Sequence, residues 1–112
     1  MAMKKLMLVV LITLVALLAC SAAGSSPMEQ QDSAAQGEAI YKMQCVMCHG
    51  RKGNLNVGGA KDLTASAIST EEMIAVVTQG KGTMVGFGST LTKQQIEAVV
   101  AHARTLRAAG PP

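Results

Sequence analysis

The chain has 112 residues, enough for one modest domain once an N-terminal export segment is set aside. Aromatic side chains are scarce, with one Tyr, one Phe and no Trp, so something else, such as a flat apolar cofactor, must fill the core. The net charge of +3 includes Lys4 and Lys5 of the export segment, and no basic stripe remains that would suit a nucleic-acid-binding protein.

The N-terminus has the charge and hydropathy of a secretory signal peptide. Lys4 and Lys5 form the positive region, and residues 6–19 are apolar apart from Thr13. A spanning helix needs about 20 apolar residues, so this stretch is short for a span, although a short uncleaved anchor stays an alternative. We therefore expect a lipoprotein-type signal peptide at residues 1–19 and export of the rest.

A third cysteine, Cys20, follows the signal region. With residues 17–19 (Leu-Leu-Ala) it resembles the lipobox of bacterial lipoproteins, in which the Cys is lipidated and becomes the mature N-terminus. The alternative is a Cys inside a plain signal peptide that is cleaved after Ala23. An unpaired thiol is awkward in an oxidising compartment, which favours lipidation. Small and polar residues follow, so residues 20–33 are expected to be a lipidated Cys and a flexible tether.

Helical patterning begins at Ala34, and the domain is expected to cover residues 34–112. Apolar and small residues spaced as on one helix face run from Ala34 to Met43 and lead into a Cys pair. Glycines then break regular structure between His49 and Ala60, and a short helical turn is expected at residues 62–67.

Two later helices are marked by capping boxes, in which a hydroxyl and a Glu or Gln three residues on satisfy orphan backbone N–H groups. Ser69 begins the first of these helices, which is expected to stop at Gly80. Thr92 begins the second, whose apolar face ends before Gly110. A loop with four glycines, residues 80–88, separates them. No alternating strand pattern occurs, so the fold class is all-α.

Residues 45–49, Cys-Val-Met-Cys-His, are typical of covalent c-type haem attachment. The thiols of Cys45 and Cys48 can each add to one haem vinyl group, and His49 is then held over the iron as its proximal ligand. A redox dithiol would need a βαβ context that this chain lacks. A zinc site would find only Cys20 and His102 as further ligands. We therefore expect one covalent haem c, wrapped by a small cytochrome c-like domain of three to four helices.

With this motif the sequence resembles the class I cytochrome c family. Residues 37–41 and the motif resemble the N-terminal helix of the family, and residues 80–84 and 96–101 resemble its distal loop and C-terminal helix. The resemblance covers residues 34–106. It implies that Met84 is the sixth iron ligand and that the Gly37 and Tyr41 face of the first helix crosses the last helix near His102.

Three features depart from the family pattern. Val85 stands where Pro usually follows the ligand Met, which leaves the distal loop less rigid. The Pro of the loop after the motif is missing near residues 58–60, so the sequence does not place the carbonyl that accepts the His49 ring N–H. His102 stands where the family usually has an aromatic residue such as Tyr.

Iron with His and Met ligands has no open coordination position, so the resemblance implies a single-electron carrier and not an enzyme. The expected location is the periplasm, where a monomer tethered to the membrane through Cys20 passes electrons between redox partner proteins. Two alternatives remain open. A loosely bound Met84 would allow a haem-based sensor of small gases, and His102 as a ligand would give a bis-His cytochrome of lower potential.

Overall fold

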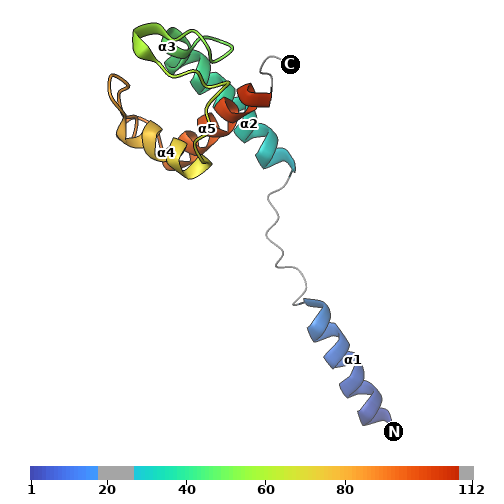
Figure 1. The fold of residues 1–112 in the computed structure, drawn as a ribbon. Coiled ribbons are helices and arrows are strands. Elements are labelled where there is room, and N and C mark those ends of the chain that lie inside the picture. The colour runs from blue at the N-terminus through green and yellow to red at the C-terminus, as the bar shows by residue number, and fades with distance from the viewer. Residues whose placement is uncertain (18–26, 109–112) are drawn as a thin grey trace.

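The computed structural model describes residues 1–17 and 27–108, in which every regular element longer than a single bridge is a helix (Figure 1). Within these ranges there is no β-strand, only one isolated bridge. The elements are α1 (Ala2–Leu17), α2 (Pro27–Gln44), α3 (Val46–His49), the 3₁₀ helix η2 (Val57–Gly59), α4 (Thr70–Gln79) and α5 (Lys93–Ala108). The all-α prediction is confirmed, and the four helices α2 to α5 agree with the expected number.

The first helix, α1, carries the apolar run that follows Lys5. Its apolar side chains up to residue 12 are exposed, and no packing of α1 on another helix is found among the described residues. A membrane-crossing helix, long and apolar enough to span, does not occur in the described ranges. The signal-peptide assignment of residues 1–19 stays a prediction, and Cys20 lies outside the described residues.

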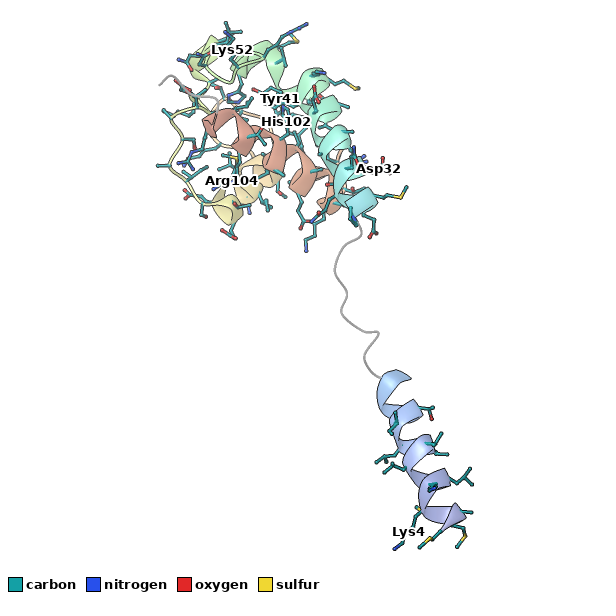
Figure 2. The ribbon with its side chains drawn as sticks, turned by 90° about the vertical axis from the view of Figure 1, so that its right-hand side faces the viewer. Lys4, Asp32, Tyr41, Lys52, His102 and Arg104 are labelled. Atoms are coloured by element: carbon teal, nitrogen blue, oxygen red, sulfur yellow. The ribbon has the colours of Figure 1, made fainter. Side chains whose placement is uncertain are left out.

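The core forms where α2 crosses α5. At the crossing point lies Gly37, where a Cβ would overlap the carbonyl oxygen of Ala98 and lie 2.7 Å from its carbonyl carbon, so only Gly permits this approach. Tyr41, one turn further along, is 2% exposed, and its ring centroid lies 5.0 Å from that of His102. Figure 2 shows both rings between the two helices. The predicted crossing of the Gly37 and Tyr41 face near His102 is confirmed.

Seven apolar residues from α2, α4 and α5 are buried. They are Tyr41, Met73, Ile96, Ala98, Val99, Val100 and Ala103. Tyr41 is the only aromatic residue among them, and α5 supplies five of the seven. The protein core described here is therefore small, as the composition predicted.

Both capping boxes mark the helix starts correctly. The Ser69 hydroxyl accepts a hydrogen bond from the Glu72 N–H at 3.1 Å, at the start of α4. At the start of α5, the Thr92 hydroxyl accepts from the Gln95 N–H at 3.2 Å, and the Thr92 N–H donates to the Gln95 side chain at 2.9 Å. α4 ends before Gly80, whose φ of 80° lies in the left-handed region that favours glycine.

Two sequence-based expectations are wrong. α2 begins at Pro27 rather than at Ala34, so the described part of the expected flexible tether, residues 27–33, is helical. Pro suits a first helical position, but residues 27–32 are exposed and carry no apolar periodicity that would reveal the helix. The expected turn of helix at residues 62–67 does not form, because Asp62 accepts hydrogen bonds from the N–H and hydroxyl of Thr64, at 2.8 and 2.6 Å.

Candidate haem-binding site

The Cys-x-x-Cys-His motif forms one helical turn at the end of α2. Cys45 lies at the junction of α2 and α3, with its N–H bonded to the Tyr41 carbonyl at 2.9 Å. The N–H groups of Cys48 and His49 both donate to the Cys45 carbonyl, at 3.3 and 2.9 Å. Cys45 is half-buried, Cys48 is exposed, and both are free thiols. One turn therefore presents two thiols and an imidazole together.

Burial changes the acidity of the Cys45 thiol. Desolvation, with a smaller contribution from the neighbouring Cys48, raises the pKa of Cys45 to about 11. Cys45 is therefore a neutral thiol at physiological pH, and its S–H hydrogen is available for addition to a vinyl group.

The imidazole of His49 is oriented by a backbone carbonyl. Its Nδ1 lies 3.0 Å from the carbonyl oxygen of Lys61. A carbonyl only accepts hydrogen bonds, so Nδ1 carries the proton and the Nε2 lone pair is free to bind a metal. Metal-binding histidines usually donate their second ring N–H in this way. Lys61 thus supplies the carbonyl that the sequence left unplaced.

Tyr41 fixes the chain where it leaves the motif. Its hydroxyl donates a buried hydrogen bond to the Gly50 carbonyl at 2.7 Å. Burial raises the pKa of Tyr41 to about 12, which keeps the hydroxyl protonated as a donor. Gly50 has a φ of 78°, and a Cβ there would lie 2.7 Å from the Leu55 Cβ. Gly50, the residue after His49, is therefore bound to Tyr41 of α2 and packs closely against Leu55 of the following loop.

The loop that carries Lys61 is closed by its own contacts. The Leu63 N–H donates to the Gly53 carbonyl at 2.7 Å. Gly53 is buried, and a Cβ at this position would lie 3.0 Å from the side chain of Leu106 in α5. The loop is thus packed on α5, which fixes the position of the Lys61 carbonyl relative to the motif.

Met84 lies in a tight turn after α4. The N–H of Lys81 donates to the Met84 carbonyl at 3.0 Å, and the N–H of Met84 donates back at 3.1 Å. Beyond the turn, the N–H groups of Phe87 and Gly88 donate to carbonyls near the end of α4, at 2.8 and 3.0 Å. Four backbone hydrogen bonds therefore hold the loop on both sides of Met84, even though Val85 replaces the usual Pro.

The turn with Met84 and the loop after His49 meet. The Thr83 hydroxyl donates to the Gly58 carbonyl at 3.2 Å and joins them. Four large apolar side chains of the motif and these loops are exposed, namely Met47, Leu55, Val57 and Val85. A flat apolar group such as a porphyrin would cover part of this surface. Two thiols, an imidazole with a free Nε2 and a thioether in the joined loop fit a haem c.

His102 lies on α5, in the contact between α5 and α2. Its ring packs on that of Tyr41 at an interplanar angle of 50° (Figure 2). It therefore occupies the position of the usual aromatic residue in a helix–helix contact. Three contributors to the site were missed from the sequence: the Lys61 carbonyl, the Tyr41 hydroxyl and the Thr83 hydroxyl. Backbone carbonyls leave no signal in a sequence, and the hydroxyl partners lie 9 and 25 residues away.

Comparison with known proteins gives a consistent result. Residues 32–102, which include the motif and Met84, match the family model described as cytochrome C oxidase, cbb3-type, subunit III. Cytochrome c6 from Aphanizomenon flos-aquae is 43% identical over 72 residues, covering 59% of this chain and 82% of the relative. Cytochrome c6 from Leptolyngbya boryana is 33% identical, and the match covers 62% of this chain and 87% of the relative. Cytochrome c6 from Rippkaea orientalis is 36% identical, and the match covers 69% of this chain and 74% of the relative. The chain therefore belongs to the cytochrome c family that this model represents: it is a small class I c-type cytochrome, a single-electron carrier with one covalent haem c and not an enzyme.

Proposed function

We propose that Cys45 and Cys48 attach the haem and that His49 and Met84 bind its iron from opposite faces. In the attachment each S–H adds across one vinyl double bond, so that a C–S bond forms and the other vinyl carbon gains the hydrogen. The contact between His49 Nδ1 and the Lys61 carbonyl, at 3.0 Å, carries the proposal, because it leaves Nε2 as the iron ligand. The bound haem supplies reversible one-electron chemistry.

Met84 is the best placed of the described methionines outside α1. Met73 is buried in the core, with 5% of its surface exposed. Met43 and Met47 flank the first attachment thiol on the proximal segment, and Met28 lies in the exposed first turn of α2. Only Met84 is half-buried in an irregular loop, where the backbone can present the sulfur to a metal.

The two alternative functions have less support. A bis-His cytochrome would require His102 to give up its contact with the Tyr41 ring. A gas sensor would require Met84 to leave the iron readily, whereas four backbone hydrogen bonds hold its loop. Electron transfer by a six-coordinate haem is the function that these contacts favour.

Visible spectra of the purified holoprotein test the ligand assignment. Met84→Ala is expected to lose the weak thioether-to-iron band at the red end of the ferric spectrum, to bind carbon monoxide more tightly and to have a lower potential. His102→Phe and Met43→Ala are expected to keep the wild-type band, affinity and potential. The opposite pattern, with His102→Phe disturbing the iron and Met84→Ala leaving it unchanged, would refute the assignment.

The N-terminal region is proposed to direct export and anchoring. Residues 1–19 act as a lipoprotein signal peptide, and lipidated Cys20 tethers the cytochrome domain, assigned to residues 34–112, on the periplasmic side of a membrane. The exposed apolar surface of α1 after Lys4 and Lys5 supports this proposal. There the domain acts as a monomer between redox partner proteins, one that donates and one that accepts electrons.

The intact mass of the mature protein tests the anchor. A lipoprotein starts at Cys20 and carries several acyl chains, which together hold it firmly in a membrane. Cys20→Ala is then expected to move the protein from the membrane fraction to the soluble fraction or to leave it unprocessed. An unmodified mature N-terminus at Ala23 or Gly24 would rule out the lipid.

A further inference from the structure

His102 is the histidine that the proposed iron site does not use. The sequence contains two histidines, and the other is His49. His102 is half-buried on α5, and its ring packs on that of Tyr41 with the centroids 5.0 Å apart (Figure 2). No hydrogen bond of the His102 ring is found among the described residues, and none of their buried side-chain nitrogens or oxygens lacks a partner, so the ring nitrogens reach water. His102 therefore exchanges a proton with solvent.

One carboxylate of α2 lies within electrostatic range of His102. It belongs to Glu38, about one turn before Tyr41, which forms an ion pair with Lys42. The hydrogen bond and charge of Lys42 lower the pKa of Glu38, and the charge of His102 has a smaller effect in the same direction. Attraction between opposite charges is mutual, so the Glu38 carboxylate stabilises a proton on His102.

Other charged groups of the elements that pack on α5 are exposed or bonded elsewhere. On α5 itself, Arg104 donates to the Ile68 carbonyl at 3.2 Å, and Glu97 is paired with Lys93. In the loop after His49, Asp62 accepts hydrogen bonds from Thr64. The remaining charged side chains of this loop and of the first turn of α4 are exposed: Arg51, Lys52, Lys61, Glu71 and Glu72. Glu38 is therefore the carboxylate that faces His102.

Tyr41 connects His102 to the iron site. Its hydroxyl donates to the Gly50 carbonyl at 2.7 Å, and Gly50 follows His49. Two contacts thus separate the His102 ring from the backbone beside the proposed iron ligand. The Tyr41 ring between them is buried, and charges are screened less across a buried group than across water. A positive charge on His102 is therefore felt at the iron site.

We propose that His102, with Glu38 as its counterion, binds a proton more tightly when the iron is reduced, so that reduction is coupled to proton uptake at the helix crossing. The inference rests on the proposed function, because iron binding by His49 leaves His102 as the free imidazole. One electron from the donor removes one positive charge at the iron, and His102 takes up a fraction of a proton from water. Coupling is reciprocal, so a proton on His102 raises the redox potential.

Spectroelectrochemical titration of the holoprotein, prepared without a histidine tag, measures this coupling. An imidazole is mostly neutral at pH 8, so His102→Phe is expected to keep the wild-type potential there, and the ligand test above belongs at this pH. At pH 5 the wild type is expected to lie about 40 mV above His102→Phe. That difference corresponds to about fivefold tighter proton binding in the ferrous protein, at about 59 mV per tenfold for one electron.

The difference between the two proteins separates His102 from other titrating groups. Haem propionates change the potential equally in both proteins, so they do not contribute to the difference. A gap between wild type and His102→Phe that is zero at both pH values, or equal at both, would overturn the proposal. An equal gap would show that the ring acts on the iron site only through packing.

The counterion is tested with a matched pair of variants. Glu38→Gln is expected to move the fall in potential to lower pH by about 0.3 unit, because the proton on His102 loses its carboxylate. Glu97→Gln makes the same chemical change in the other carboxylate that is paired with a lysine four residues away, and is expected to keep the wild-type curve. An equal effect of the two substitutions would overturn the proposed counterion.

Proton NMR of the wild type tests the coupling without any substitution. The Cε1–H signal of His102 is followed against pH in the ferrous and ferric proteins. The midpoint is expected to lie about 0.7 pH unit higher in the ferrous protein, which is the same fivefold difference, and equal midpoints would overturn the proposal. Failure of the proposed function would be seen separately, as a second titrating imidazole, because His49 would then be free of iron.

Discussion

Substitution of Gly37 by Ala is the strictest test of the helix crossing. At an exposed helix interior this change gains about 0.8–1.0 kcal/mol of stability from helix propensity. Here the new Cβ would overlap the carbonyl oxygen of Ala98 and lie 3.3 Å from the backbone nitrogen of Val99. These backbone atoms cannot turn away as a flexible side chain would, so α2 and α5 must move apart.

Overpacking of a close-packed site costs about 1–3 kcal/mol, and the backbone clash puts Gly37 at or above the upper end of that range. After the gain in propensity we expect Gly37→Ala to lose roughly 2 kcal/mol of unfolding free energy. For a domain of this size that loss lowers the Tm by about 8–16 °C.

Guanidinium chloride unfolding of the holoprotein, followed by far-ultraviolet circular dichroism, measures this loss. The matched control is Gln36→Ala, at the neighbouring exposed position of α2, which changes propensity without a clash and is expected to stay within about 0.5 kcal/mol of the wild type. If Gly37→Ala were as stable as the wild type, the close approach of α2 to Ala98 would not be what requires glycine.

Four further predictions concern Tyr41, the cap of α4 and the attachment of the haem. Tyr41→Phe is expected to cost about 1–1.5 kcal/mol in denaturant unfolding, because the buried bond to Gly50 is lost; no change would contradict a role for that bond. The raised pKa of Tyr41 adds stability that is present below pH 10 and lost as the pH rises towards 12, so the wild type should lose more stability than Tyr41→Phe over that range; parallel pH profiles would disprove this. Ser69→Ala is expected to lower the Tm through loss of about 1 kcal/mol of capping energy, and an unchanged Tm would show that the cap is dispensable. Replacing Cys45 and Cys48 together by Ser should leave little folded protein, because the haem completes the core, and cooperative melting without haem would contradict this.

The sequence predicted the structure correctly where the interacting groups lie within a few residues of one another. Ser69 and Thr92 mark the starts of α4 and α5 because a capping hydroxyl and its N–H partner lie three residues apart in the sequence. The attachment motif is equally local, since one helical turn holds both thiols and His49. The crossing of Gly37 with α5 is not local, because Ala98 lies far away in the chain. It was therefore inferred only from the family resemblance.

Prediction from the sequence failed where burial or backbone hydrogen bonding determines the local structure. The first turns of α2 from Pro27 are exposed, so no apolar periodicity distinguishes them from a tether. Residues 62–67 looked helical, but the short side chain of Asp62 satisfies the Thr64 N–H within a turn. The loop around Met84 was expected to be less rigid without Pro, yet its hydrogen bonds run to α4 and across the turn, which composition does not reveal.

The ligand geometry of His49 depends on contacts that begin at the helix crossing. Gly37 brings α2 against α5, which buries the ring of Tyr41 beside His102. The Tyr41 hydroxyl then holds Gly50, the residue after His49.

Helix α5 also supports the imidazole through the loop that carries Lys61. Its Leu106 packs on Gly53 in the loop whose Lys61 carbonyl lies 3.0 Å from His49 Nδ1. Both contacts depend on α5: Tyr41 packs against it from α2, and the Lys61 loop packs on it directly. Moving α2 away from α5 therefore shifts the contact through Tyr41 and leaves the contact through Lys61 in place. Gly37→Ala should therefore alter the orientation of the imidazole as well as the stability, which the ferric spectrum of the variant would reveal under conditions where it remains folded.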